Sequence, residues 1–184
     1  TRSADQYAAA YVPVTINIPH EMLASCASWL LDYETPFYLI VDPENLADAV
    51  DSLVYIGLDN IAGYFETSAI SMLEQHGMPL DSYELAHPAE ITAKIESGSV
   101  DLIAVRGQGD RDRGHIHGAN HYMLGFLRDR AGELINGKPI VVQRQSSARA
   151  AIGASILKAQ GANEVINMVG GMTAWKNAGL PLEQ

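Results

Sequence analysis

The chain has 184 residues, and 47% of its side chains are apolar, which suffices for a packed core in one or two domains. Because 22 Asp and Glu outnumber 12 Lys and Arg, the protein repels phosphate backbones, and we expect no nucleic-acid partner. The longest apolar stretches, such as 37–41, fall far short of the roughly 20 residues that cross a bilayer, so we expect a soluble protein without a membrane span.

Cys26 is the only cysteine of the chain. A single thiol excludes an intramolecular disulfide and a cysteine-based zinc site, and it favours a reducing compartment. We therefore expect a cytoplasmic protein. The sequence begins at Thr1 without Met and without a secretory pattern, and we expect it to be a piece of a longer chain.

Short buried runs alternate with amphipathic stretches along the sequence. The first half predicts strands over 16–18 and 37–41, a helix around Cys26 and a helix over 46–56. The second half predicts strands over 100–105, 140–143 and 165–169, helices over 124–134 and 148–160, and a last helix carrying Trp175. Strands that are apolar throughout and separated by helices indicate an α/β fold, with a parallel central sheet flanked by helices.

The two halves of the chain repeat one pattern. Segments match at offsets of 103 to 104 residues: 11–17 with 115–121, 36–41 with 139–144, and 56–61 with 160–165. Constant spacing is typical of an internal repeat. We expect a partial first unit over 1–77, a linker over 78–88 that contains Pro and Asp, and a second unit over 89–184.

Two further expectations concern strand ends. By offset, Thr1-Arg2 corresponds to the strand end at Val105-Arg106, so the strand that should precede Arg2 is absent from the sequence. The first sheet is therefore either completed by upstream residues or open. Gly170-Gly171 is expected to permit a tight turn, with Trp175 in the core.

The turn that follows strand 140–143 is the expected ligand site. It consists of Arg144, Gln145, Ser146, Ser147, Ala148 and Arg149. A turn from a strand end into a helix N-terminus aims backbone N–H groups at one point, where the helix dipole also favours negative charge. The carboxyl ends of parallel strands are also where open α/β sheets bind ligands. The turn predicts an anion cradle, unless it is an ordinary loop in which Ser146 or Ser147 caps the helix.

Four motifs of the second half occur in a family-specific order and spacing. They are Leu102–Arg106, Gly114–Ala119, Gln145–Ala151 and Gly170–Trp175. With them, the segment from about Glu84 to Pro181 resembles a rhodanese (thiosulfate sulfurtransferase) domain, and a fainter copy covers Thr1 to about Phe65. The tandem is similar to the C-terminal part of metallo-β-lactamase-fold proteins fused to rhodanese domains, some of which are persulfide dioxygenases. The resemblance implies two rhodanese-like units, the first of them partial.

In rhodaneses a cysteine opens the loop and passes a sulfane sulfur from thiosulfate or a persulfide to a thiol acceptor. The resemblance places Arg144 at that position, and a guanidinium can neither attack nor form a persulfide. Ala104 stands where the family has aspartate, His117 where it has proline, and Ser147 where it has glycine. In the first copy Val41 occupies the cysteine position. We therefore expect no catalytic residue for sulfur transfer in either copy.

Two other kinds of chemistry are open to the sequence. Cys26 could act as a nucleophile, but a lone thiol among small and apolar neighbours usually packs as a small hydrophobe. His115, His117 and His121 could bind zinc, because alternate residues of a strand face one side. However, Gly118 breaks the strand geometry, and no carboxylate completes a motif. We expect no metal site and no cofactor in this chain.

Arg144 and Arg149 favour a binding loop for a small sulfur-containing or other anion, although Arg144 could instead pair with an acidic neighbour. The resemblance adds Arg106 and His115 as supporting residues. We expect a rhodanese-like module of sulfur metabolism that binds an anion, or that docks to and regulates an upstream catalytic domain or a partner enzyme. The rivals are an active thiosulfate or persulfide sulfurtransferase and a fragment of a metal-dependent hydrolase or dioxygenase.

Overall fold

The computed structural model of the protein describes residues 1–111, 113–145 and 147–183. The chain divides into two compact units. The first comprises 1–13 and 17–82, and the second comprises 14–16 and 83–184. Among the described residues, no helix is both long and apolar enough to cross a membrane.

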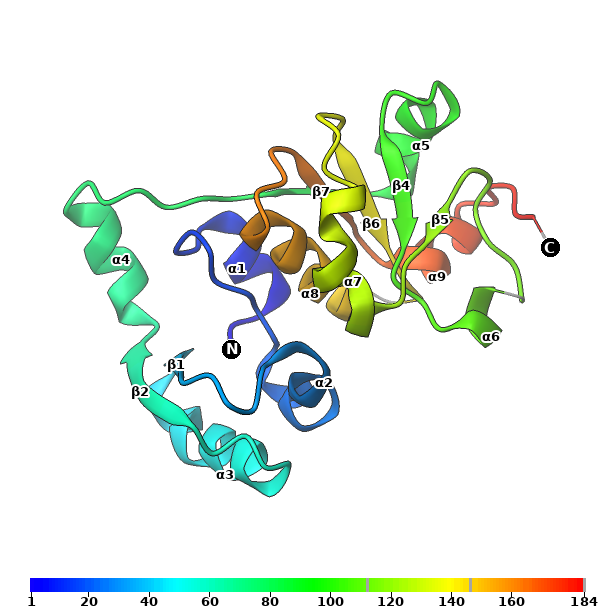
Figure 1. Cartoon of the computed structure of the whole chain (residues 1–184). Coiled ribbons are helices and arrows are strands. Elements are labelled where there is room, and N and C mark those ends of the chain that lie inside the picture. The colour runs from blue at the N-terminus through cyan, green and yellow to red at the C-terminus, as the bar shows by residue number, and fades with distance from the viewer. Residues whose placement is uncertain (112, 146, 184) are drawn as a thin grey trace. The chain divides into compact units, whose positions relative to one another are not determined.

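The first unit contains a two-stranded parallel sheet (Figure 1). Its strands are β1 (Phe37–Val41) and β2 (Ile61–Glu66), and α3 (Leu46–Tyr55) connects them. Helix α3 buries Ala49 and Leu53, which lie four residues apart on one face. The structure confirms the predicted strand 37–41 and, within one residue, the predicted helix 46–56. The other elements are α1 (Ala4–Ala9), η1 (His20–Met22), α2 (Leu23–Leu30), η2 (Pro43–Asn45) and α4 (Ser68–Gln75).

The second unit is built on a five-stranded parallel sheet with the order β3-β7-β6-β4-β5. The strands are β3 (Glu84–Ala86), β4 (Asp101–Ala104), β5 (Asn120–His121), β6 (Ile140–Gln143) and β7 (Val165–Met168). The helices are α5 (Pro88–Glu96), α6 (Gln108–Arg111), α7 (Leu127–Arg130), α8 (Ser147–Ala159) and α9 (Gly171–Asn177), with short turns η3 (Leu124–Phe126) and η4 (Ala131–Glu133). The predicted α/β fold, a parallel sheet flanked by helices, is therefore confirmed for this unit.

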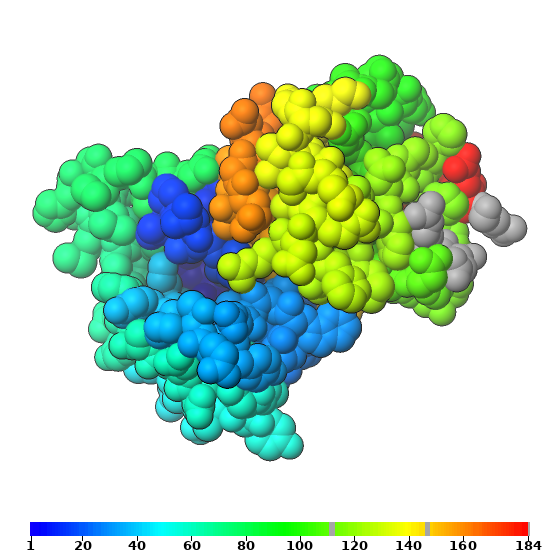
Figure 2. Space-filling view, in the orientation of Figure 1, coloured from blue at the N-terminus to red at the C-terminus, as the bar shows by residue number. Residues whose placement is uncertain are grey.

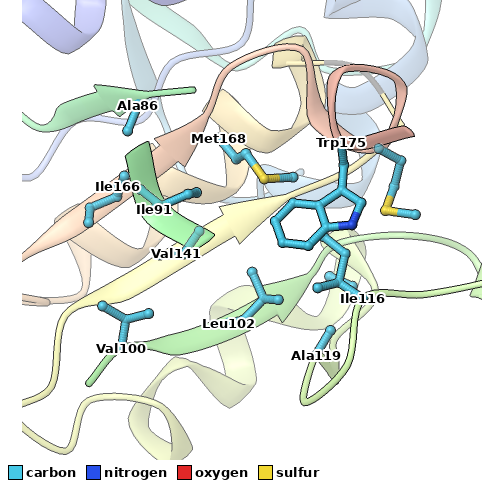
Figure 3. Close-up of a cluster of buried hydrophobic side chains, with 12 residues drawn as sticks. Ala86, Ile91, Val100, Leu102, Ile116, Ala119, Val141, Ile166, Met168 and Trp175 are labelled. Carbon is cyan, nitrogen blue, oxygen red and sulfur yellow. The ribbon is translucent and has the colours of Figure 1, made fainter. Parts of the chain in front are cut away.

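Helices cover both faces of this sheet. Every residue of β6 and β7 is buried, as the uniformly apolar runs predict for central parallel strands. On one face, α8 packs so closely that a Cβ on Gly153 would lie 3.2 Å from Val142 Cγ1 and 3.4 Å from Leu127 Cδ2 of α7. On the other face, α5 and α9 contribute Ile91 and Trp175 to the core. Figure 3 shows the Trp175 ring beside Met168 and Ile116.

Two predicted elements are wrong in form. Residues 15–19 form no strand. The Asn17 carboxamide accepts from Arg2 N–H and donates to Arg2 O, so a side chain supplies the bonds that a strand ladder would give. The single helix predicted over 124–134 is divided into η3, α7 and η4. Gly125 and Gly132 explain this break, because each glycine costs a helix interior about 1 kcal/mol. Figure 2 shows this segment, in yellow-green, at the surface of the second unit.

The linker predicted over 78–88 extends too far. It includes strand β3, which pairs with β7 in the register Glu84↔Ile166 to Ala86↔Met168. Pro88 marked the end of the expected linker, yet it is the first residue of α5, where proline is favoured because its missing N–H has no helical partner. The continuous part of the second unit therefore begins at Tyr83.

Candidate functional site

The predicted loop begins where the central strand β6 ends. Strand β6 lies between β4 and β7, and Gln143 at its end pairs with Ala104. Helix α8 begins at Ser147 and continues for 13 residues. The structure therefore has the predicted turn from a central parallel strand into a long helix, at the carboxyl edge of the sheet.

The six residues of the turn differ in exposure. Arg144 is half-buried, Gln145 is exposed, and Ala148 and Arg149 are half-buried in the first turn of α8. Ser146 lies outside the described residues, and so does the side chain of Ser147; the choice between these two serines as a helix cap therefore stays a prediction. Arg144 directly follows β6, and Arg149 lies in the first turn of α8; their role as an anion site stays a prediction.

The first turn of α9 fixes the backbone of the loop. Met172 N–H donates to Arg144 O at 2.7 Å. Thr173 donates to Gln145 O through its N–H at 3.4 Å and through Oγ1 at 3.1 Å. Gln145 Nε2 in turn donates to Thr173 Oγ1 at 3.3 Å. These hydrogen bonds fix the positions of the Arg144 and Gln145 carbonyls. Because the N–H groups of Met172 and Thr173 donate to these carbonyls, they are not available to a ligand.

Gly171 makes this contact possible. Its φ is +53°, and a Cβ on it would lie 2.0 Å from Arg144 O, so a side chain there would exclude the loop from its position. Gly170 also has a positive φ, of +71°. The predicted tight turn at the two glycines is confirmed, and so is the core position of Trp175, which is buried and donates through Nε1 to Pro181 O at 2.9 Å. Sequence reasoning missed that Gly171 accommodates Arg144.

Gln143 is a second feature that sequence reasoning missed. Its side chain is 0% exposed, and neither Nε2 nor Oε1 has a hydrogen-bond partner among the described residues. In β7, Asn167 is also buried with an unpartnered Oδ1. Buried polar groups without partners are rare and concentrate at functional or strained positions. In the sequence, the indication of a buried polar side chain at this position is that a glutamine directly follows the apolar run Ile140–Val142.

Arg106 organises the segment that follows β4. It is buried, and its Nη groups donate to Gly114 O at 2.7 Å and to Asp110 O. Burial lowers the pKa of Arg106 from its ordinary value, against the opposing effect of Asp110. His121 Nε2 donates to Arg106 O at 2.6 Å. Arg106 therefore supports residues 107–114, and both of its Nη groups are engaged by backbone carbonyls.

The three histidines have different partners. His117 Nδ1 lies 2.5 Å from Glu183 Oε1, and His115 Nε2 lies 3.6 Å from Glu183 Oε2. His115 also forms an isolated antiparallel bridge with Glu183. The His121 ring is directed to Arg106 instead. Within the described part of the chain, no three His, Cys, Asp or Glu side chains are grouped so that they could hold a metal ion.

Cys26 lies in helix α2 of the first unit, as predicted for a helical position. It is 5% exposed, and its Sγ lies 3.6 Å from Ser25 Oγ. The loop at 144–149 belongs to the second unit. The packing of the thiol agrees with the role of a small core residue.

A parallel sheet covered on both faces, with a strand-to-helix turn at its carboxyl edge, defines the second unit as an α/β domain with a candidate anion loop. The rhodanese-like domain family matches residues 87–178, from the cap of α5 through α9. The chain therefore belongs to the rhodanese-like family.

Similar proteins share parts of this chain. The uncharacterized protein YqhL of Bacillus subtilis is 35% identical over 74 residues, 40% of this chain and 59% of YqhL. The putative sulfur carrier protein YrkF of the same organism is 35% identical over 83 residues, 45% of each chain. The chain thus spans about half the length of these curated relatives. The structure of a rhodanese-like domain from Anabaena has a TM-score of 0.50 and 25% identity, covering 54% of this chain and 77% of that one.

Proposed function

We propose that the second unit is a non-catalytic rhodanese-like module that binds a small sulfur-containing or other anion in the loop 144–149. The observation that carries the proposal is that Arg144 directly follows β6 and Arg149 lies in the first turn of α8, while α9 holds the carbonyls of Arg144 and Gln145 in place. Each charge-assisted hydrogen bond to an anion contributes about 1.5 to 3 kcal/mol. The proposal involves no cofactor, and the bound anion would serve an attached or partner enzyme of sulfur metabolism.

The lack of a nucleophile at the loop supports binding over catalysis. By the rhodanese resemblance, Arg144 occupies the position of the sulfur-carrying cysteine, and an arginine cannot form a persulfide. The only thiol of the chain, Cys26, is buried in α2. Cys26 is therefore the only side chain of the sequence that could carry a sulfur atom as a persulfide.

We also propose that the first unit is a partial copy of the second. The order of elements supports this, since β1, α3, β2 and α4 follow one another as β6, α8, β7 and α9 do. Both strand pairs are parallel, and Tyr38↔Gly63 has the register position that Val141↔Ile166 has. The tandem arrangement and the fusion to an upstream metal-dependent domain are parts of this proposal.

Titration calorimetry of the full chain with sodium thiosulfate, and separately with sodium sulfate, at low ionic strength tests the anion site. We expect saturable heat with at least one anion, and at least tenfold weaker binding in Arg144→Ala and in Arg149→Ala, because tenfold corresponds to about 1.4 kcal/mol. Lys94→Ala, which removes an exposed cation of α5, should bind as the parent does. Heat that does not saturate with either anion, or equal affinity in Arg144→Ala, contradicts the proposal.

A gain of function tests the lost nucleophile. If the loop keeps the shape of a sulfur-transfer loop, the thiolate created by Arg144→Cys, combined with Ser147→Gly, should attack the outer sulfur of thiosulfate and release sulfite. The resulting persulfide would be visible as a 32-Da addition expected for one sulfur by mass spectrometry. Arg144→Cys alone should acquire less. A double variant that folds as the parent does, judged by circular dichroism, but takes up no sulfur would show that the loop geometry differs as well.

Sulfur transfer is the second candidate, because YrkF is described as a putative sulfur carrier. It requires Cys26 as the sulfur-bearing group. Turnover of thiosulfate and cyanide that disappears in Cys26→Ser would establish this candidate and refute the non-catalytic role. We expect no turnover above that of Cys26→Ser.

A further inference from the structure

The first turn of α9 has N–H donors that no carbonyl of the helix accepts. The first N–H groups of any helix lack intrahelical partners, and in α9 they include those of Met172 and Thr173. Within the described part of the chain, no side chain caps this helix. The carbonyls of Arg144 and Gln145 take the place of a cap, since they accept from these two N–H groups at 2.7 and 3.4 Å. The loop 144–149 and α9 therefore hold each other.

The hydroxyl of Thr173 adds two hydrogen bonds to this contact. Its Oγ1 donates to Gln145 O at 3.1 Å and accepts from Gln145 Nε2 at 3.3 Å. One hydroxyl thus holds both the backbone and the side chain of Gln145. Because both residues are exposed, core packing does not fix their positions, and these hydrogen bonds do. Threonine suits this role, since its branched Cβ restricts χ1 and limits the directions that Oγ1 can take.

The same contacts set the direction of the Gln145 N–H. In a trans peptide unit the C=O and the N–H point in opposite directions, and the described residues contain no cis peptide bond. Arg144 O is bound by α9, so the Gln145 N–H of that peptide unit points away from α9. No acceptor for this N–H is found among the residues that the structure describes. A donor of this kind in an exposed residue is available to a ligand.

Helix α8 lies on the side to which this N–H points. It packs on one face of the sheet, where Gly153 meets Val142, whereas α9 contributes Trp175 to the core on the opposite face. Arg149 belongs to the first turn of α8, and the N–H groups of that turn also lack intrahelical partners. The Gln145 N–H is therefore directed to the side of the loop on which Arg149 lies.

We propose that Thr173 is the positioning residue of the anion loop: by holding Gln145 on α9, it directs the Gln145 N–H toward the bound anion. The anion accepts from this N–H together with the guanidinium groups of Arg144 and Arg149. The inference rests on the proposed function for its ligand. The hold of Thr173 on the loop, however, is measurable without any anion.

Limited proteolysis of the full chain by trypsin, which cleaves after Arg and Lys, measures this hold. Cleavage after Arg144 requires the loop to leave α9, so its rate reports how often the loop is open. Cleavage after Arg113, an exposed residue of the same unit, is the internal reference. Thr173→Val replaces the hydroxyl by a methyl group of similar size. We expect it to raise the ratio of the two rates about fivefold, which corresponds to about 1 kcal/mol.

Two matched variants separate the role of the hydroxyl from a general loss of stability. Thr173→Ser keeps the hydroxyl and should return the ratio to within about twofold of the parent's. Thr92→Val removes a hydroxyl that donates to Pro88 O at 2.6 Å in α5, and it should leave the ratio unchanged. Circular dichroism and thermal melting check that each variant is folded. An unchanged ratio in Thr173→Val, or an equal increase in Thr92→Val, overturns the inference.

Amide-proton NMR during a titration with sodium sulfate tests the direction of the N–H. A hydrogen bond to the anion should move the Gln145 amide proton downfield in the parent and in Thr92→Val, and much less in Thr173→Val at the same fractional occupancy. Sulfate binding without a downfield shift of Gln145 overturns the assignment of this donor. If no anion binds, the proposed function fails together with the role of the N–H, while the proteolysis ratio still decides whether Thr173 holds the loop.

Discussion

Arg2 and Arg106 make the same pair of backbone hydrogen bonds, one in each unit. Arg2 donates to Gln6 O at 3.1 Å and to Ala10 O, the carbonyls four and eight residues later. Arg106 donates to the carbonyls at the same spacing, Asp110 O and Gly114 O. Each arginine thereby binds the backbone on both sides of the end of the short helical segment that follows it, α1 or α6.

The neighbours of the two arginines correspond as well. Asn17 Nδ2 donates to Arg2 O at 2.9 Å, and His121 Nε2 donates to Arg106 O at 2.6 Å. An isolated antiparallel bridge follows in each unit: Tyr11 with Asp81, and His115 with Glu183. Different residue types thus meet one geometric requirement, which supports the proposal that the units share an origin.

Replacing Arg106 by Ala should destabilise the second unit by about 3 kcal/mol. The substitution leaves the buried carbonyl of Gly114 and the partly buried carbonyl of Asp110 without their charged donor, and hydrogen bonds to charged groups contribute about 1.5 to 3 kcal/mol each. Urea unfolding followed by circular dichroism measures the change. Arg113→Ala is the control, because it removes an exposed Arg113–Asp110 pair expected to contribute about 1 kcal/mol or less. Equal losses in both variants would contradict a structural role for Arg106.

Gly171→Ala should destabilise the protein by at least about 3 kcal/mol and weaken anion binding. The added Cβ meets Arg144 O, and both overpacking and a positive φ oppose a side chain. Gly179→Ala isolates the effect of the positive φ from that of overpacking, because Gly179 has a φ of +68° with nothing within 4 Å of an added Cβ. Thermal melting should therefore show a larger loss for Gly171→Ala. Similar losses would mean that the contact with Arg144 is unimportant.

Gln143→Met should stabilise the protein by about 1 kcal/mol or more. The buried carboxamide lacks partners among the described residues, and an unsatisfied buried polar group costs about 1 to 3 kcal/mol. Methionine has a similar shape and no polar group to satisfy. Chemical denaturation measures the gain, and Gln160→Met, at an exposed position, should change stability by no more than about 0.5 kcal/mol. A loss of stability in Gln143→Met would show that the carboxamide is well paired in solution.

Glu133→Gln should reduce the loss of stability in acid. Hydrogen bonds from Arg130 lower the pKa of Glu133, so the carboxylate stabilises the folded state above its unfolded pKa. That contribution disappears as the pH falls through the lowered folded pKa. The variant should therefore be less stable than the parent at pH 7 and equally stable near pH 2. Denaturation at several pH values measures this, with Glu96→Gln, an exposed glutamate of α5, as the control.

Local patterns in the sequence were sufficient to predict the elements around the site. The apolar runs 37–41 and 140–143 are β1 and β6, and the small and apolar residues after Ser147 form α8. The position of the loop between β6 and α8 follows from these elements alone. Strand and helix periodicities are properties of neighbouring residues, so a sequence can show them directly.

Burial and contacts between distant segments depend on the tertiary structure. Strand β3 exists only because β7 pairs with it, and the need for Gly171 arises only where Arg144 O approaches it. Tyr38 and Val141 belong to equally apolar strands, yet one is exposed and the other buried. The composition of a strand shows that it can be covered, but helices from distant parts of the sequence determine whether it is, because burial requires them to pack on the sheet.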